Sequence, residues 1–259
     1  MLDGHENIII ELRKAFVEVC KSVFGESLVS IITKGSSVKG GFIPGLSDVD
    51  LHVYLEDDVF IYSDFLKLEF GLSMQEKMDE LIGKYDLGGG PIQVILINVS
   101  QPPDWSGPLP GAYIVLYGDG DPLPPPTVEG MLKQDLDGLK NPTYAYKLIS
   151  SFLDKGNDQL PNYVRRLNPA VNPALYRVLS LLTRDPAKVW KMTKFEVLDA
   201  LERLADESAK EVTRLGREFY DMARQKERLG KDLDFCRTAI RTGYKVVDLG
   251  REIGLRLDY

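Results

Sequence analysis

Two aspartates separated by one residue lie in the stretch GSSVKGGFIPGLSDVDLHV, residues 35–53. In a strand running from 47 to 56, Asp48 and Asp50 point to one face and the intervening apolar residues point to the other. Two carboxylates this close repel each other unless a cation lies between them or one is protonated, and paired oxygen ligands suit Mg²⁺. The spacing therefore predicts a metal site on a strand that is anchored by its apolar face.

A Gly-Ser pair precedes these carboxylates. Gly35 permits a tight turn, and Ser36 stands where a strand would lead into a short helix, whose free N–H groups and hydroxyl favour an anion. Together with a nearby Mg²⁺ site, these features predict binding of a nucleoside triphosphate.

Each of these features alone is more often structural than catalytic, because Asp and Gly-Ser are common in turns. Their combination with a glycine-bearing loop and an alternating strand favours a functional site. His52 shares the face of the aspartates, but a lone strand histidine is usually packed and hydrogen-bonded, so we expect it in the core.

The elements that must position these residues alternate between helix and strand. Hydrophobic periodicity predicts helices over 6–25 and 63–85 and strands over 27–35, 47–56 and 89–99. Such alternation is typical of an α/β unit with a small mixed sheet.

The run YGDGDPLPPPTVEG cannot continue a helix or a central strand, and it marks a domain boundary. Beyond it, helical periodicity covers 142–155, 172–184, 194–230 and 231–253. The sequence therefore predicts an α+β protein with an α/β domain over 1–122 and a helical bundle over 123–259.

The composition and charge of the chain indicate which binding partners to expect. The 259 residues include 44% hydrophobic residues, enough for real cores, and carry a formal net charge of −7. An acidic chain disfavours a long nucleic acid and favours a cationic small molecule. The sequence has only two cysteines and shows no basic, apolar leader, so we expect the protein to be cytoplasmic. It also has no apolar run long enough for a membrane span.

The stretch over 35–53 resembles the Gly-Ser and Asp-x-Asp motif of the nucleotidyltransferases of the DNA polymerase β superfamily. Within them it is most similar to the streptomycin and spectinomycin (aminoglycoside) adenylyltransferases. PIQVILINVSQPPDW is similar to the third catalytic strand of that group, and LLTRDPAKVWKMTKFEVLDAL resembles part of its helical domain. Together the three stretches span both halves of the chain.

The resemblance implies transfer of a nucleoside monophosphate, with ATP as the expected donor, to a hydroxyl of a small acceptor. It implies that Asp48 and Asp50 bind Mg²⁺ and that Gly35 and Ser36 hold the β- and γ-phosphates. Ser47, next to Asp48, would add another hydroxyl contact. The helical domain would bind the acceptor between the two domains.

One residue departs from the pattern of the group. Where these adenylyltransferases carry a glutamate as base on the third strand, this chain has Gln93. A neutral amide can offer its carbonyl oxygen to a metal or a hydroxyl, but it cannot take a proton near neutral pH. Either another group supplies the base, or the chain is a weakened relative that only binds nucleotide. Gln93 could also be a surface residue of an edge strand.

In the second half, Thr193 and Glu196 fit a capping box that places Lys194 in the first turn of a helix. Lys194 is either a solvated lysine or a contact to a nucleotide phosphate across the interdomain cleft. Four aromatic residues are candidates for an acceptor pocket, although core packing is their usual role at helical spacing: Tyr144, Tyr146, Tyr163 and Tyr176.

Overall fold

The chain forms two compact units, residues 1–126 and 127–259. The structure is a computed structural model that describes residues 3–63, 65–85, 92–101, 107–151 and 155–257. The predicted start of the third strand (89–91), the end of the second motif (102–105) and part of one predicted helix (152–154) lie outside these residues. Each unit is described by itself.

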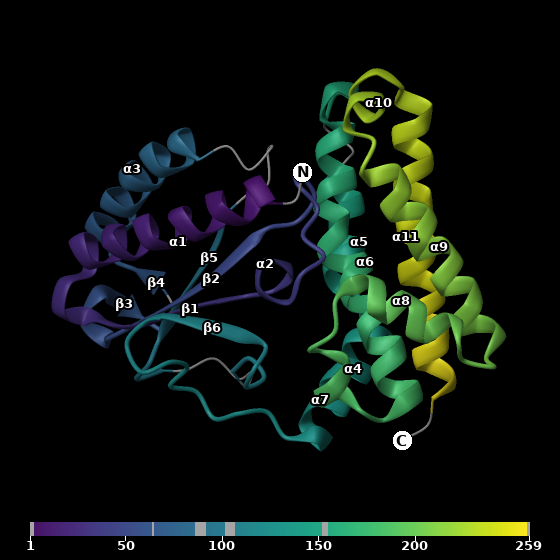
Figure 1. The fold of residues 1–259 in the computed structure, drawn as a ribbon, viewed down its shortest axis with the longest axis horizontal. Coiled ribbons are helices and arrows are strands. Elements are labelled where there is room, and N and C mark those ends of the chain that lie inside the picture. The colour runs from purple at the N-terminus through teal and green to yellow at the C-terminus, as the bar shows by residue number, and fades with distance from the viewer. Residues whose placement is uncertain (1–2, 64, 86–91, 102–106, 152–154, 258–259) are drawn as a thin grey trace. The chain divides into compact units, whose positions relative to one another are not determined.

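The N-terminal unit is a four-stranded mixed sheet with helices on one face (Figure 1). Its elements are α1 (Asp3–Phe24), β1 (Leu28–Lys34), α2 (Ser36–Lys39), β2 (Val49–Leu55), β3 (Phe60–Tyr62), β4 (Phe65–Leu66), α3 (Leu68–Lys84), β5 (Ile92–Asn98) and β6 (Tyr113–Tyr117). The strand order is β5-β2-β1-β6. β2 runs parallel to β5, and β1 runs antiparallel to β2 and β6.

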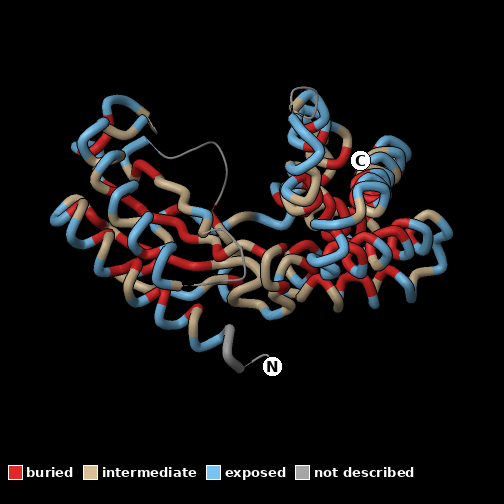
Figure 2. The backbone as a smooth tube through the Cα atoms, turned by 90° about the horizontal axis from the view of Figure 1, so that it is seen from above, coloured by how far each residue is buried: buried red, intermediate tan, exposed pale blue. Residues whose placement is uncertain are grey.

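The alternation of β2 explains how the sheet is anchored. Val49, Leu51 and Val53 are fully buried in one apolar cluster with α1 and α3. The opposite face carries a smaller cluster that includes Tyr54 and Leu123, from the chain beyond β6. The buried residues, which include these positions of β2, are drawn in red in Figure 2.

Two elements of this unit differ from the sequence prediction. β6 lies where the sequence predicts no strand, just before the Pro/Gly run, and it forms by pairing with β1. The helix predicted from residue 63 begins at Leu68, because Phe65 and Leu66 pair with β3 instead. In both cases tertiary pairing decides the conformation of a short apolar run.

The C-terminal unit is all helical. Its helices are α4 (Val128–Lys140), α5 (Thr143–Ser150), α6 (Leu160–Thr183), α7 (Pro186–Val189), α8 (Lys194–Glu202), α9 (Glu207–Ala223), α10 (Lys226–Lys231) and α11 (Leu233–Arg256). The long α6 and α11 pack against each other, and α4 and α9 pack against both.

Helix boundaries in this unit also depend on packing. The pattern predicted over 194–230 divides into three helices, and Asp206 caps the second of them by accepting the Ala209 N–H at 2.7 Å. α6 begins before the predicted residue 172 and continues through Pro169 and Pro173. Its extensive buried face offsets the backbone hydrogen bonds that the two prolines remove.

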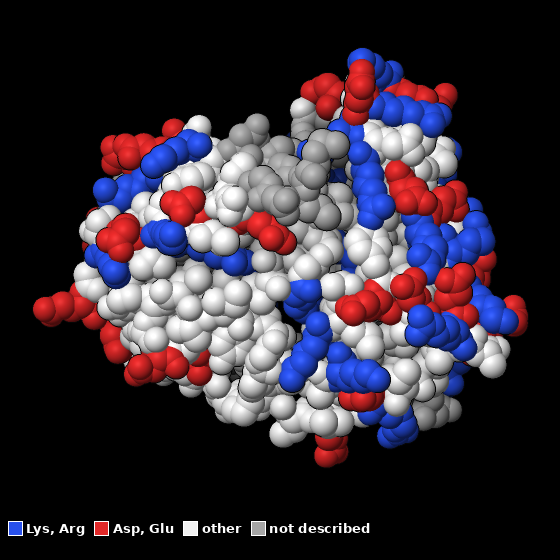
Figure 3. Space-filling view, viewed as in Figure 1, with Lys and Arg blue, Asp and Glu red and all other residues white. Residues whose placement is uncertain are grey.

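The surface carries both charge signs side by side on the face seen in Figure 3. Much of this mixing comes from pairs three or four residues apart on helices, such as Arg214 with Glu211 and Glu218. Within the described residues, no helix is both long and apolar enough to cross a membrane.

Candidate active site

The Gly-Ser turn joins β1 to the four-residue α2. Gly35 has φ 77°, in the left-handed region that disfavours side chains, and its carbonyl accepts the N–H groups of Val38 and Lys39 at 3.1 and 3.0 Å. Ser36 is the first residue of α2. The predicted transition from a strand to a short helix is therefore present.

Gly35 lies directly against the carboxylate of Asp50. A Cβ atom at Gly35 would stand 2.1 Å from Asp50 Oδ2, so only glycine leaves room for this carboxylate. Lys34 and Asp50 are partners in the β1–β2 register. The Gly-Ser turn and the second aspartate thus meet in space, although the loop 40–48 separates them in sequence.

Asp48 immediately precedes β2, and both aspartates are partly buried. Burial raises the pKa of Asp50 to about 6, and the nearby charge of Asp48 adds to the rise, while Lys34 and Lys39 oppose it. A carboxylate with a raised pKa near another carboxylate is stabilised by a bound cation.

Gln93 of β5 is the register partner of Asp50 in the parallel β2–β5 pair, and its side chain is exposed. Partners in a ladder direct their side chains to the same face. The structure therefore brings Gln93 beside Asp50, where an amide oxygen can contact a metal or a substrate hydroxyl.

Three cations near this end of the sheet were not identified from the sequence. Arg13 of α1 holds α2, since its Nη2 donates to the carbonyl and the hydroxyl oxygen of Ser37 at 2.8 and 3.0 Å. Lys34 and Lys39 both lie within electrostatic range of Asp50, and burial lowers the pKa of Lys39 to about 8. Antiparallel pairing of β1 with β2 was the signal that could have found Lys34.

Ser47 and His52 are both buried. Ser47 is 2% exposed, and its hydroxyl oxygen accepts the Ile43 N–H at 2.9 Å, which braces the loop before Asp48. His52 is fully buried, as expected, and burial lowers its pKa to about 3, with a further contribution from Lys34. A histidine that stays neutral to such low pH is a weak base.

Lys194 belongs to the helical unit. The predicted capping box is present: Thr193 N–H donates to Glu196 Oε2 at 2.7 Å, and Glu196 N–H donates to Thr193 Oγ1 at 3.2 Å. The solvated-lysine reading is wrong, because Lys194 is only 4% exposed and its Nζ lies 5.4 Å from the ring centroid of Tyr220.

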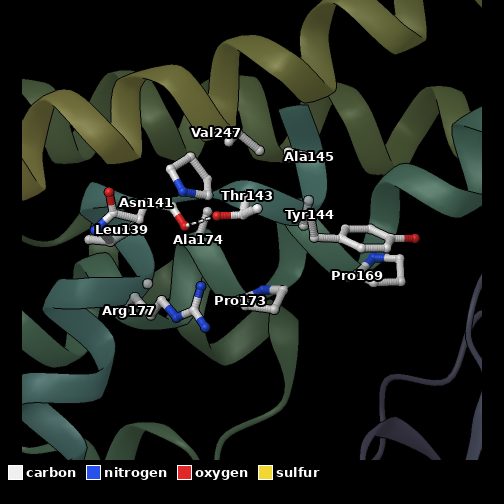
Figure 4. Close-up of a pocket in the computed structure, with 13 residues that line it drawn as sticks. Leu139, Asn141, Thr143, Tyr144, Ala145, Pro169, Pro173, Ala174, Arg177 and Val247 are labelled. Carbon is white, nitrogen blue, oxygen red and sulfur yellow. Dashed lines mark hydrogen bonds between the residues drawn. The ribbon is translucent and has the colours of Figure 1, made fainter. Parts of the chain in front are cut away.

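The helical unit also contains a cavity of about 230 Å³ beside α4, α5, α6 and α11 (Figure 4). Tyr144, Pro169, Pro173 and Arg177 are among the residues that line it. Ligand pockets commonly have about 300–1,000 Å³. Because this cavity is smaller, we do not assign the acceptor to it.

Of the four tyrosines considered for an acceptor pocket, only Tyr144 lines this cavity. Tyr163 and Tyr176 are each 2% exposed and belong to the core, as is usual for aromatic residues at helical spacing. Tyr146 is half-exposed, and its hydroxyl donates to Asp248 Oδ1 at 2.7 Å.

Comparisons with known proteins agree with this geometry. Residues 13–87, which contain the Gly-Ser turn and both aspartates, match the model of the nucleotidyltransferase domain family. A solved structure of spectinomycin adenyltransferase AAD(9) from Enterococcus faecialis, with ATP and spectinomycin, is similar to this chain with a TM-score of 0.53 and 14% sequence identity. The similarity covers 90% of this chain and 99% of that chain. No curated protein matches.

These matches confirm the predicted α+β fold class and, at the level of the fold, the resemblance to the aminoglycoside adenylyltransferases. The N-terminal unit therefore contains a region, residues 13–87, that is similar to the nucleotidyltransferase domain family.

Proposed function

We propose that the protein transfers a nucleoside monophosphate from ATP to a hydroxyl of a small molecule and that the reaction depends on Mg²⁺. The observation that carries the proposal is the position of Asp50, whose carboxylate lies against the backbone of Gly35 at the start of α2. A triphosphate bound by the turn would have its charge beside the two carboxylates, an arrangement that requires a cation between them.

The residues fit Mg²⁺, which commonly takes one or two carboxylates and completes its coordination with substrate phosphates and water. Asp48 and Asp50 would hold the ion, which when bound neutralises negative charge on the transferred phosphoryl group. Gly35 and Ser36 bind the β- and γ-phosphates through backbone N–H groups and the Ser36 hydroxyl. Gln93 positions the acceptor hydroxyl through its carbonyl oxygen.

Ser47 has a secondary role in this proposal. Ser47 orders the loop that presents Asp48, because its hydroxyl oxygen already accepts the Ile43 N–H. The similar adenyltransferase was crystallised with ATP and spectinomycin. By analogy, we assign acceptor binding to the helical unit and an aminoglycoside-like acceptor as the first class to test.

Mass spectrometry of the purified protein with ATP, Mg²⁺ and a pooled library of hydroxyl-bearing small molecules tests the proposal. We expect an acceptor to gain the mass of one nucleotide and pyrophosphate to be released. Aminoglycosides and neutral polyols belong in separate pools, because an acidic protein favours cationic acceptors. The Asp48→Asn/Asp50→Asn variant should abolish both transfer and Mg²⁺-dependent ATP binding, and unchanged binding would contradict the metal assignment.

A second function is favoured by Gln93, which cannot act as a general base. In that alternative the protein binds nucleotide and Mg²⁺ without efficient transfer. ATP binding by calorimetry, combined with no transfer to any acceptor pool, would favour this alternative over catalysis.

A further inference from the structure

The cavity of the helical unit has a single charged side chain among the described residues that line it, Arg177 of α6. Most of the other lining residues are apolar, and they include Leu139, Pro173 and Val247. In Figure 4 the guanidinium group of Arg177 is directed toward Pro173 and Thr143. The cavity therefore combines an apolar wall with one positive charge.

The guanidinium group of Arg177 has donors to spare. Its Nε is buried without a hydrogen-bond partner, and its two Nη atoms make no hydrogen bond to any described residue. The carboxylate of Asp135 lies 4.0 Å from Nε, beyond hydrogen-bond distance, and its other oxygen accepts the Ser180 hydroxyl at 2.5 Å and the Trp190 indole N–H at 3.1 Å. A partly buried guanidinium with unsatisfied donors is stabilised by a bound anion.

The wall of the cavity is built from residues that helices otherwise disfavour. Pro169 and Pro173 lie inside α6, where each removes a backbone hydrogen bond, and Arg177 follows on the same face. Gly138 lies in α4, where glycine is less favourable than alanine. A Cβ atom at Gly138 would stand 2.4 Å from Arg177 Cζ and 2.7 Å from Nη1 and Nη2, so glycine leaves room for the guanidinium group. Residues that break local rules in this way are typical of functional sites.

We propose that this cavity binds a small organic carboxylate with a compact apolar body, a ligand distinct from the nucleotide and its acceptor. The guanidinium fork of Arg177 would bind the planar carboxylate through two parallel hydrogen bonds, and the apolar wall would cover the rest of the molecule. A carboxylate is favoured over a phosphate, because the nearby Asp135 repels a doubly charged anion more strongly than a singly charged one. The cavity volume of about 230 Å³ suits a molecule smaller than most ligands. The proposal does not depend on nucleotidyl transfer.

Benzoate and isobutyrate are the probes, with benzamide as a neutral molecule of the same shape as benzoate and inorganic phosphate as the competing anion. Nuclear magnetic resonance of the full-length, methyl-labelled protein locates their binding. We expect both carboxylates to shift the methyl resonances of Ala174 and Val247, which line the cavity, and benzoate to bind with a Kd of about 1 mM or lower. Benzamide should bind about tenfold more weakly or worse. Equal binding of benzamide, tighter binding of phosphate, or no saturable shift of these methyl groups by either carboxylate would overturn the proposal.

Two variants test the part played by the guanidinium group. Arg177→Met should weaken benzoate binding about tenfold or more, but it also removes the counter-charge of the buried Asp135. Gly138→Ala keeps every charge and places a methyl group against the guanidinium, so it should weaken binding by a similar factor. Arg241→Met and Gly230→Ala are the matched controls with wild-type affinity, because Arg241 is exposed on α11 and a Cβ at Gly230 meets nothing within 4 Å. If Arg177→Met does not fold, Gly138→Ala alone decides. Wild-type affinity in the folded test variants would overturn the proposal.

Discussion

Asp50 and Gln93 stand side by side, as partners in the register of the parallel strands β2 and β5. β5 is an edge strand, and the Gln93 side chain is exposed next to the carboxylate of Asp50. Gln93 can therefore be a surface residue of an edge strand and also belong to the site.

Gln93→Glu should raise nucleotidyl transfer, because it restores a group that can accept a proton, and general-base help contributes about 10²- to 10⁴-fold. The gain should require Mg²⁺, which offsets repulsion between the new carboxylate and Asp50. Steady-state rates with and without Mg²⁺ measure it. Gln75→Glu, the same change on the exposed side of α3, is the control. A fully active wild type with a harmful Gln93→Glu would place the base elsewhere.

Gly35→Ala should weaken Mg²⁺-dependent ATP binding about tenfold or more, a loss of at least about 1.4 kcal/mol. The new methyl group would collide with Asp50 Oδ2 at 2.1 Å and displace the carboxylate. Gly25→Ala provides a matched control, because Gly25 also has a positive φ, 54°, but has no atom within 4 Å of an added Cβ. Calorimetry of both variants separates the collision from backbone strain, and equal losses would contradict the role given to Gly35.

Asp50→Asn should make the metal-free protein more stable at pH 8. The raised pKa, about 6, means that the folded state holds this proton more tightly than the unfolded state, whose pKa is near 3.8. The stabilisation from protonated Asp50 is complete below the unfolded pKa and is lost as pH rises through about 6.

Urea unfolding in EDTA at pH 4 and pH 8 measures this effect. After allowance for solvent screening, we expect a gain of about 1 to 2 kcal/mol at pH 8 and a smaller one at pH 4. Asp79→Asn, on the exposed side of α3, serves as the control. A variant less stable than wild type at pH 8 would show that Asp50 is not held in an unfavourable charged state.

Gly243→Ala should destabilise the helical unit by about 1 to 3 kcal/mol, the usual cost of overpacking. A Cβ atom at Gly243 of α11 would lie 2.4 Å from Leu167 Cδ2 and 3.0 Å from Phe219 Cε2. Gly230→Ala in α10 meets nothing within 4 Å, so it should stabilise slightly through helix propensity. Thermal unfolding followed by circular dichroism compares the stability of the two variants. If Gly243→Ala is as stable as wild type, α6 and α9 can move away from α11 at this position.

The features that the sequence predicted well are those set by neighbouring residues. Alternation along β2 put Leu51 in the core and Asp50 on the opposite face, and the Thr193–Glu196 capping box formed as expected. Lys34 was missed because its importance comes from pairing with Asp50 across two strands. β6 and the early start of α6 were missed because long-range packing outweighs local turn and proline signals.

The sheet order has a consequence for how the site is assembled during folding. Lys34 and Asp50 meet when β1 and β2 pair as neighbours along the chain, whereas Gln93 arrives only after α3 has carried the chain over to the parallel β5. Contacts between distant segments form more slowly because a longer loop must close. The Gly-Ser turn and the two carboxylates should therefore come together first, and Gln93 should be the last of these residues to join them.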